Sequence, residues 1–525
     1  MELFRNEQIL DFSQGANRDG IAHAIAALLD QGPEDVPLKI GGERVVTGRW
    51  IESRDPGDAR RLLGRVARAG APEALRGIAA ADEAFRTWSR TPPADRAAVL
   101  HRAAGIIRRR RLELDALLML EAGKVALEAD GDLAEAIDFL EFYAREMLRY
   151  AGEQPLVKLA GEANALTYIP LGVGAVIPPW NFPLAILAGM TAAAVVTGNT
   201  VVLKPSSETP LIGWRLAEVL EEAGLPAGVV NFVPGSGSEI GDLIVQHPRI
   251  RFISFTGSKE VGLRINELAA RTSEGQIWIK RVVAEMGGKD SIIVDADADI
   301  TAAADGIVAS AFGYQGQKCS ACSRAIILDP VYDEVVRRVV AGAGALRVGP
   351  VEDPATRVGP VIGEGALRSI SKYIEIGKGE GRLVAGGARA QGPGLDNGFF
   401  LEPTVFADVH PKARISQEEI FGPVLALIRA RDFDQALAIA NNTEFGLTAA
   451  VYSRSRAHLE KARVEFHAGN LYFNRKCTGA LVGVHPFGGF NMSGTDSKAG
   501  GRDYLLLFLQ AKLVSEKVLG PREVQ

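Results

Sequence analysis

Two of the chain's three cysteines stand three positions apart in the stretch GYQGQKCSAC, residues 313–322. Cys319 and Cys322 have the spacing of a redox or metal-binding pair. A tetrahedral zinc site needs four ligands, however, and neither a second cysteine pair nor a histidine lies near this stretch. A polar loop with Lys318 beside the cysteine is more typical of a nucleophile, because a thiolate needs access and a nearby positive charge. The residue types therefore favour nucleophilic chemistry and no metal site.

A nucleophile of this kind needs a base and a donor for the charge that its attack creates. Glu285, in VVAEMGGKD, ends an apolar run beside two glycines, where a partly buried carboxylate can act as a general base. An ion pair with Lys289 explains the same glutamate. Asn181, in IPPWNFP, lies among prolines that fix the backbone, so its amide can donate to an oxyanion. A rigid strand-to-helix turn explains that stretch equally, and on these residues alone both alternatives stay open.

Two glycine-rich turns have the composition of phosphate-binding loops. FTGSKEVG, residues 255–262, runs from a strand into a glycine and then a serine that can cap the next helix, which would aim free amides at a phosphate. GSGSEIG, residues 235–241, comes close to a dinucleotide-binding fingerprint but has three residues instead of two before its last glycine. Either stretch alone is also compatible with an ordinary tight turn.

Strand and helix patterns alternate between residues 173 and 290. Such alternation predicts a parallel sheet covered on both faces, with ligands at the carboxyl ends of the strands. The strands are expected at VGAVIPP, TVVLKP, GVVNFVP, RFISFTG and IIV, and the helices over 183–197, 210–224, 238–246 and 258–270. Upstream, 72–150 predicts charged helices broken at TPP, with RRRR at 108–111 as a solvated face. A second α/β unit begins near 297 and contains the cysteine loop.

Composition excludes several classes of protein. The 525 residues carry a formal charge of −5 and a pI near 6.0, so nothing indicates a nucleic-acid partner. An odd number of cysteines and an N-terminus without signal-peptide features predict a reducing, cytoplasmic location. Residues 185–203 are apolar enough to span a membrane, but TGNT at 197–200 predicts a helix followed by a strand instead. A small-molecule substrate is the expected partner, without nucleic acid or membrane.

Seven motifs in order give the chain a resemblance to the aldehyde dehydrogenase superfamily over residues 40–515. They are PWNFP, LKPSS, FTGS, EMGGK, GQKC, EEIFGP and PFGG, with 23 positions from Asn181 to Lys204 and 34 from Glu285 to Cys319. The resemblance implies an α/β aldehyde dehydrogenase fold in three parts. These are a Rossmann-like NAD(P)-binding domain at 1–152 and 170–290, an α/β catalytic domain at 291–490 carrying Cys319, and a small β oligomerisation arm at 153–169 and 507–525.

The resemblance also implies the chemistry. Cys319 would attack an aldehyde carbon, with the Asn181 amide and the Cys319 backbone N–H stabilising the oxyanion. Glu285 would activate water to hydrolyse the resulting thioester, which favours a hydrolytic enzyme over one that acylates CoA. Cys322 is then expected to be a small buried residue at the start of the next strand, and the Cys-x-x-Cys spacing to be incidental.

Cofactor roles follow from the same resemblance. Lys204 and Glu419 would hold the two riboses of NAD, Phe421 the nicotinamide, and Trp180 with Ser258 the pyrophosphate. Further cofactor contacts are expected from Pro179, Ser207, Gly237, Thr256 and Gly257. Relatives that prefer NAD often carry an acidic residue three positions after the lysine, but this chain has Ser207 there and Glu208 next. Without that carboxylate to repel a 2′-phosphate, NADP remains open as an alternative to NAD.

Within the superfamily, three stretches resemble the branch that oxidises L-glutamate γ-semialdehyde in proline catabolism: residues 469–489, AEAIDFLEFYAR at 134–145, and CSA. That substrate carries a carboxylate and an ammonium opposite its aldehyde. The pocket residues implied are Gly479, Ala480 and Ser320 for the carboxylate, with Lys318, Glu135, Phe182 and Phe487 around them. Succinate semialdehyde is the alternative substrate. A homo-oligomer is expected, at least a dimer with a hexamer as an option, served by a separate proline dehydrogenase.

Overall fold

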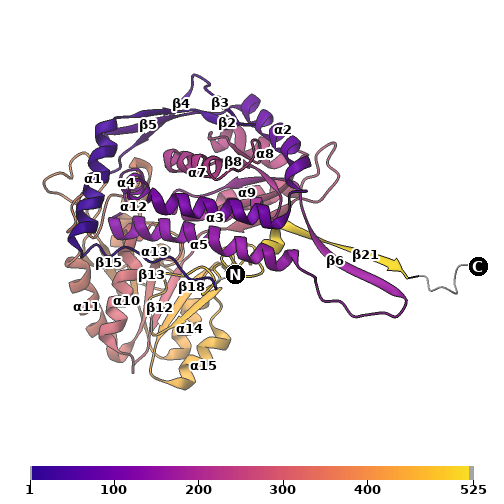
Figure 1. Ribbon diagram of the computed structural model, residues 1–525. Coiled ribbons are helices and arrows are strands. Elements are labelled where there is room, and N and C mark those ends of the chain that lie inside the picture. Colours follow the sequence, from indigo (N-terminus) through magenta and orange to yellow (C-terminus); the bar gives the residue numbers. More distant parts are fainter. Residues whose placement is uncertain (1–2, 519–525) are drawn as a thin grey trace, which may run out of the picture.

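Two seven-stranded sheets organise the computed structural model, which describes residues 3–518 (Figure 1). In the first sheet five parallel strands are followed by an antiparallel pair at one edge. Its order is β11 (Arg281–Glu285), β10 (Ile250–Thr256), β7 (Val173–Ile177), β8 (Thr200–Leu203), β9 (Val230–Phe232), β2 (Leu38–Ile40) and β3 (Glu43–Val45). The four expected strands from VGAVI to RFISFT are confirmed. Apart from Arg251 near the start of β10, these four strands carry no charged residue, because helices cover both faces of the sheet.

The helices around this sheet also follow the sequence pattern. The connections are α6 (Ala185–Val196), α7 (Pro210–Glu222), α8 (Asp242–Gln246) and α9 (Lys259–Ala270), and the upstream helices are α2 (Ala71–Trp88), α3 (Pro93–Arg109), α4 (Arg111–Ala122) and α5 (Ala126–Ala151). The apolar stretch 185–203 is helix α6 followed by strand β8, as expected. Across residues 3–518, no helix is both long and apolar enough to cross a membrane.

One surface expectation is wrong. RRRR does not form a single solvated face, because α3 ends and α4 begins within it. Arg109 is exposed and pairs with Glu222, but Arg111 is largely covered and donates two hydrogen bonds to the buried carboxylate of Asp130. A run of like charges does not reveal such a turn of direction between two helices.

The second sheet contains the strand predicted at IIV. It was expected to continue the first sheet, and instead lies in the middle of the second as β12. The order is β14 (Arg382–Ala385), β15 (Thr404–Ala407), β16 (Val424–Ala430), β13 (Cys322–Leu328), β12 (Asp290–Val294), β18 (Thr448–Tyr452) and β19 (Asn470–Phe473), all parallel except β14. The helices on it are α10 (Ile300–Phe312), α11 (Tyr332–Gly344), α12 (Glu364–Lys378), α14 (Phe433–Asn441) and α15 (Arg456–Glu465).

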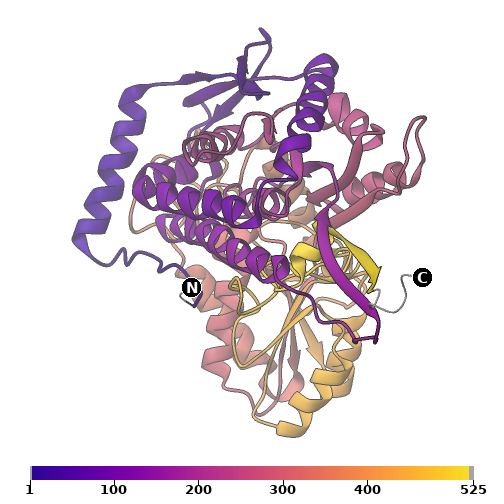
Figure 2. The same cartoon turned by 45° about the vertical axis from the view of Figure 1, so that its right-hand side comes forward.

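A two-stranded ribbon leaves the body of the molecule (Figures 1 and 2). It pairs β6 (Glu162–Pro170) with β21 (Leu509–Lys517) in antiparallel register. Strand β21 lies within the segment 507–525 expected for the arm, and β6 ends one residue beyond the other segment, 153–169. The preceding 3₁₀ turn, Tyr504–Phe508, belongs to the body, since Leu505 and Phe508 are fully buried. Residues 1–2 and 519–525, which were assigned to the ends of the cofactor domain and the arm, lie outside the described residues.

The N-terminal part adds helix α1 (Gly15–Gln31) and a small sheet of β1 (Glu34–Val36), β5 (Leu62–Ala67) and β4 (Trp50–Arg54). More important for function is the passage between the two large sheets. Strand β11 ends at Glu285 and strand β12 begins at Asp290, so only residues 286–289 separate them. Residues at this crossover between β11 and β12 therefore lie beside both sheets.

Candidate active site

The crossover packs its backbone directly against the cysteine loop. A side chain at Gly288 would overlap the carbonyl oxygen of Cys319 and lie 2.6 Å from Oδ2 of Asp290, so only glycine fits there. At Gly287 a side chain would meet the carboxylate of Glu419, which would have to move. The two glycines of EMGGK thus bring Glu285, Cys319 and Glu419 to one place although they are far apart in the chain.

Asn181 reaches the cysteine loop from the first sheet. It follows β7 and the prolines after it, is buried, and its Nδ2 donates to the carbonyl oxygen of Gln317 at 3.1 Å. Gln317 is itself fixed, because its Oε1 accepts from the Ile362 N–H at 2.9 Å. The Asn181 amide is therefore held two residues before Cys319, and one of its two N–H groups remains for another acceptor.

Cys319 is partly exposed, and all three cysteines are free thiols. Burial raises the pKa of the Cys319 thiol well above its ordinary value, and the carboxylates of Asp290, Glu419 and Glu285 raise it further. The Ser320 N–H lowers it, as expected of a loop amide. The positive charge expected from Lys318 is already paired with Glu128, because its Nζ donates to both carboxylate oxygens at 2.8 and 2.7 Å.

Glu285 lies in a recess walled by glycines. A Cβ at Gly488 would lie 2.8 Å from its Oε1, and one at Gly494 would lie 3.4 Å from its Oε2. The hydroxyl of Ser497 donates to Oε1, whereas Oε2 is buried without a hydrogen bond among residues 3–518. Burial raises the pKa of Glu285 to about 8, against the opposing effects of Ser497, Lys498 and the Gly489 N–H. The alternative ion pair with Lys289 does not form in the described part of the chain, where the Lys289 amine is buried and unpaired.

The cofactor candidates lie on both sides of this crossover. Lys204 follows β8, and within residues 3–518 its Nζ donates only to carbonyl oxygens, those of Pro205 at 3.4 Å and Gly235 at 3.3 Å. Burial lowers its pKa to about 8. Glu419 accepts from the Gly288 N–H at 2.9 Å through Oε1. A buried amine without a carboxylate partner is suited to binding hydroxyl groups of a ligand.

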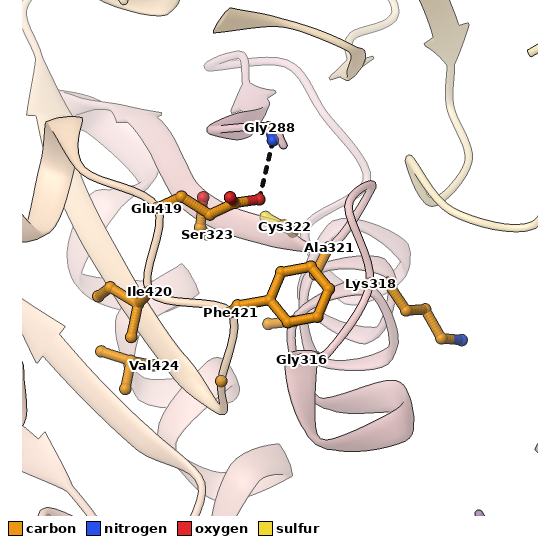
Figure 3. A pocket seen from close by; sticks show the side chains of 12 residues that line it. Gly288, Gly316, Lys318, Ala321, Cys322, Ser323, Glu419, Ile420, Phe421 and Val424 are labelled. Atoms are coloured by element: carbon orange, nitrogen blue, oxygen red, sulfur yellow. Dashed lines mark hydrogen bonds between the residues drawn. The ribbon is translucent and has the colours of Figure 1, made fainter. Parts of the chain in front are cut away.

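Figure 3 shows the pocket between the cysteine loop and the stretch from Glu419 to Phe421. The Phe421 ring meets the Trp180 ring edge-on, with 5.4 Å between centroids, so these two cofactor candidates from opposite sheets lie together. The Lys318 side chain extends away from Glu419 and Phe421 in the same view. The two aromatic rings, the Glu419 carboxylate and the cysteine loop together can bind a flat ring.

The predicted serine cap is confirmed. Ser258 stands before α9, and its hydroxyl oxygen accepts from the Val261 N–H at 3.4 Å. Thr256 ends β10, and a side chain at Gly257 would lie 2.6 Å from the Phe255 ring. At GSGSEIG the chain forms a short π-helical turn, Gly237–Gly241, before α8, instead of the regular helix expected from 238. Gly237 and Ser207 are exposed, and Pro179 is half-buried.

These features fit a dinucleotide cofactor. The helix N-terminus at the carboxyl end of β10 suits a pyrophosphate, and the unpaired Lys204 amine with the free oxygen of Glu419 suits ribose hydroxyls.

The substrate candidates approach the cysteine loop from two directions. Phe182 packs edge-on against Tyr314 at 6.4 Å, and Ser320 is buried, with its carbonyl oxygen accepting from the Thr448 hydroxyl at 3.3 Å. Glu135 lies on α5, where burial and then Asp132 raise its pKa to about 8.

The loop that carries Gly479 and Ala480 reaches Ser320 through Cys477, whose thiol donates to the Ser320 carbonyl oxygen at 3.5 Å. Gly479 adopts a left-handed conformation, with φ +80°, which glycine adopts readily. Phe487 forms a two-way backbone bridge to Ala499, a residue of the segment that carries Ser497. Cys322, in contrast, is buried at the start of β13, as predicted.

Several polar residues at the site were missed. Two of them lie on α5: Glu128, which pairs with Lys318, and Asp132, whose carboxylate lies 3.3 Å from the amine of the fully buried Lys124. Acidic residues at 128, 132 and 135 share one helix face, a spacing that marks a polar face but not its partner. Ser497 and Lys498, after the last recognised motif, have no local signal at all.

The aldehyde dehydrogenase family model matches residues 45–514, and the chain belongs to this family. The resemblance drawn from seven motifs and the expected α/β fold are thereby confirmed. Among individual relatives, 1-pyrroline-5-carboxylate dehydrogenase of Geobacillus thermodenitrificans is 60% identical over 98% of this chain and 99% of its own.

Solved structures of such enzymes are also similar to this chain. The 1-pyrroline-5-carboxylate dehydrogenase from Thermus with bound NAD is 52% identical, with a TM-score of 0.96 over 98% of this chain and 99% of that one. Proline utilization A from Bdellovibrio bacteriovorus is 44% identical with a TM-score of 0.97, and the match covers 99% of this chain but 54% of that longer one.

Proposed function

We propose that the protein oxidises L-glutamate γ-semialdehyde, which is in equilibrium with 1-pyrroline-5-carboxylate, to L-glutamate with NAD as hydride acceptor. One observation carries the proposal: Cys319, Asn181 and Glu285 meet at the crossover between the two sheets. The relatives named above, similar over nearly the whole chain, support the choice of substrate.

The first half of the reaction uses Cys319 and Asn181. The Cys319 sulfur, as thiolate, adds to the aldehyde carbon, and the carbonyl oxygen becomes an oxyanion that accepts from the Asn181 amide and the Cys319 backbone N–H. Bound NAD supplies the acceptor for the hydride that leaves this carbon. When the oxyanion collapses, the carbonyl re-forms and the substrate remains as a thioester on Cys319.

The second half uses Glu285. Its carboxylate takes a proton from water, the oxygen adds to the thioester carbon, and the carbon–sulfur bond breaks to release the acid and the Cys319 thiolate. Because burial raises the pKa of Glu285 to about 8, the ionised base becomes more populated as the pH rises through that value. The hydrolytic step should therefore accelerate between pH 7 and 9.

The cofactor set is proposed as expected from the sequence. Lys204 and Glu419 would hold the riboses, Phe421 with Trp180 the nicotinamide, and Ser258 at the start of α9 the pyrophosphate. Pro179, Ser207, Gly237, Thr256 and Gly257 would complete the contacts. For the substrate, Ser320 and the backbone of Gly479 and Ala480 would anchor the carboxylate, with Glu135, Phe182, Lys318 and Phe487 around it.

The domain roles and assembly are proposals as well: a cofactor domain at 1–152 and 170–290, a catalytic domain at 291–490, and an arm that joins copies into at least a dimer. The ribbon supports this, because Leu513 and Val514 of β21 are about half exposed and each of its strands has a free edge. Cytoplasmic location and supply of substrate by a separate proline dehydrogenase stay predictions.

The test is a comparison of aldehydes with the purified protein. Initial rates of NADH or NADPH formation would be measured with pyrroline-5-carboxylate and with succinate semialdehyde, each with NAD and with NADP. We expect kcat/KM to be at least about tenfold higher with pyrroline-5-carboxylate, because succinate semialdehyde is one carbon shorter and lacks the α-ammonium, so its carboxylate does not reach the same anchor when its aldehyde lies at Cys319. Preference for succinate semialdehyde would reject the proposed substrate, and no turnover of either would reject the proposed reaction.

A further inference from the structure

The segment after the last recognised motif wraps around Glu285. The Thr495 N–H donates to the carbonyl oxygen of Ala284 at 2.9 Å, and the Met286 N–H donates to the carbonyl oxygen of Ser493 at 2.8 Å. Glu285 and Gly494 form a bridge between these bonds. Residues 493–497 are thus bound to the end of β11 and held in a fixed register beside Glu285.

In this register the Ser497 hydroxyl lies against one oxygen of the Glu285 carboxylate. The Ser497 side chain is buried and donates to Oε1 of Glu285. Among residues 3–518 no other side chain donates to this carboxylate, and Oε2 has no hydrogen-bond partner. A Cβ at Gly488 would lie 2.8 Å from Oε1, so this position leaves no space for a side chain of its own beside Glu285. The two oxygens therefore differ: Oε1 is occupied and Oε2 is available.

The charged and titratable groups that face Glu285 come from three elements. Lys498 and Asp496 lie on the same segment as Ser497, Cys319 lies on its loop, and Tyr504 lies on the 3₁₀ turn behind. Lys498 is committed elsewhere, because its Nζ donates to the carbonyl oxygens of Gly469 at 2.7 Å and Gly488 at 2.6 Å. Lys498 therefore acts on Glu285 through its charge and not through a hydrogen bond. Ser497 is the direct side-chain partner, beside the Gly489 backbone N–H.

We propose that Ser497 is a positioning residue for the base: its hydroxyl fixes Glu285 through Oε1 and leaves Oε2 to accept the proton of the hydrolytic water. The inference rests on the proposed role of Glu285 in thioester hydrolysis. Because a hydrogen bond to a carboxylate favours the ionised form, Ser497 also keeps the base ionised at a lower pH than burial alone would allow. A serine that only filled space would have neither effect.

The experiment separates hydrolysis of the thioester from its formation. p-Nitrophenyl acetate acylates a reactive cysteine without cofactor or aldehyde: the sulfur adds to the ester carbon, p-nitrophenolate leaves, and water then cleaves the acetyl thioester. The rate of the nitrophenolate burst reports acylation. Decay of the acetylated protein, followed by intact mass spectrometry from pH 6 to 10, reports deacylation. The variants are Ser497→Ala and Ser497→Thr, with Ser493→Ala as the matched buried serine whose hydroxyl binds the Gly446 N–H.

We expect Ser497→Ala to keep the burst but to slow deacylation about tenfold at pH 7 and to displace its pH profile about one unit to the alkaline side. Ser497→Thr should restore the wild-type profile, and Ser493→Ala should not move it. An unshifted profile in Ser497→Ala, or a threonine variant as impaired as the alanine variant, would overturn the inference. An ester burst without turnover of pyrroline-5-carboxylate would reject only the proposed substrate, whereas no burst at all would reject both.

Discussion

The two sides of Cys319 differ in the state of their ionisable groups. On the side of the sheet crossover stand the carboxyl groups of Glu285, Asp290 and Glu419, each with a raised pKa whose largest cause is burial. On the side of helix α5 the charged groups stand as ion pairs, Lys318 with Glu128 and Lys124 with Asp132. The first side holds protons that chemistry can move. The second side, called the fixed side, is dominated by the two ion pairs, beside Glu135, a further carboxyl group whose pKa burial raises to about 8.

The fixed side also positions the oxyanion residue. The Lys124 amine is fully buried, 4.2 Å from the centre of the Phe182 ring and 4.1 Å from that of Tyr314. Its partner Asp132 accepts from the Ala185 N–H at 2.7 Å, at the start of α6. The chain just after Asn181 is thus held by Lys124, before α5, and by Asp132 of α5. This comparison predicts loss of chemistry from changes on the proton-holding side and loss of stability from changes on the fixed side.

The largest effect is expected from Cys319→Ser. A hydroxyl is a far weaker nucleophile than a thiolate, so kcat/KM for NADH formation should fall by about a thousandfold or more, with the thermal unfolding midpoint nearly unchanged. Cys322→Ala is the control, since Cys322 is buried at the start of β13 and should retain most of the activity. Equal activity of Cys319→Ser and the wild type would remove Cys319 from the mechanism.

On the fixed side, Lys124→Met should act on stability. The substitution keeps the volume but leaves the Asp132 carboxylate buried without its cation, which costs roughly 3–5 kcal/mol of unfolding free energy. The thermal midpoint should fall by several degrees, measured by differential scanning calorimetry. Lys372→Met, at an exposed position on α12, is the control and should leave the midpoint in place. An unchanged midpoint in Lys124→Met would contradict the structural role of this ion pair.

The contrast between the two sides also marks the limit of prediction from sequence. Four of the seven strands of the first sheet, β7 to β10, and the Ser258 cap could be predicted, because apolar runs and capping residues are local signals. The strand at IIV was given to the wrong sheet, since a buried strand does not encode its neighbours. The partner of Lys318 lies 190 positions away and that of Glu285 lies 212 away, so no local spacing could reveal either.

A third prediction concerns the proton on Cys319. Because burial and three carboxyl groups raise the pKa of its thiol, the ligand-free protein should react slowly with iodoacetamide at pH 7. Only the thiolate reacts, so the rate should rise nearly tenfold per pH unit from 7 to 9, without a plateau in that range. Peptide mass spectrometry would assign the label to Cys319. A plateau below pH 8 would mean that a positive charge activates the thiol after all.

The smallest effect is expected from a carboxylate introduced at a solvent-exposed position, and not in the protein interior. Ser207 is exposed three positions after Lys204, at the site where an acidic side chain would oppose a 2′-phosphate. Ser207→Glu should lower kcat/KM with NADP by about tenfold, since solvent screens the repulsion, and leave kcat/KM with NAD within about twofold. Ser206→Glu, one position nearer Lys204, is the matched control for a charge placed beside the cofactor loop. If both variants reduced NADP use equally, the effect would come from net charge near the loop and not from a contact at position 207.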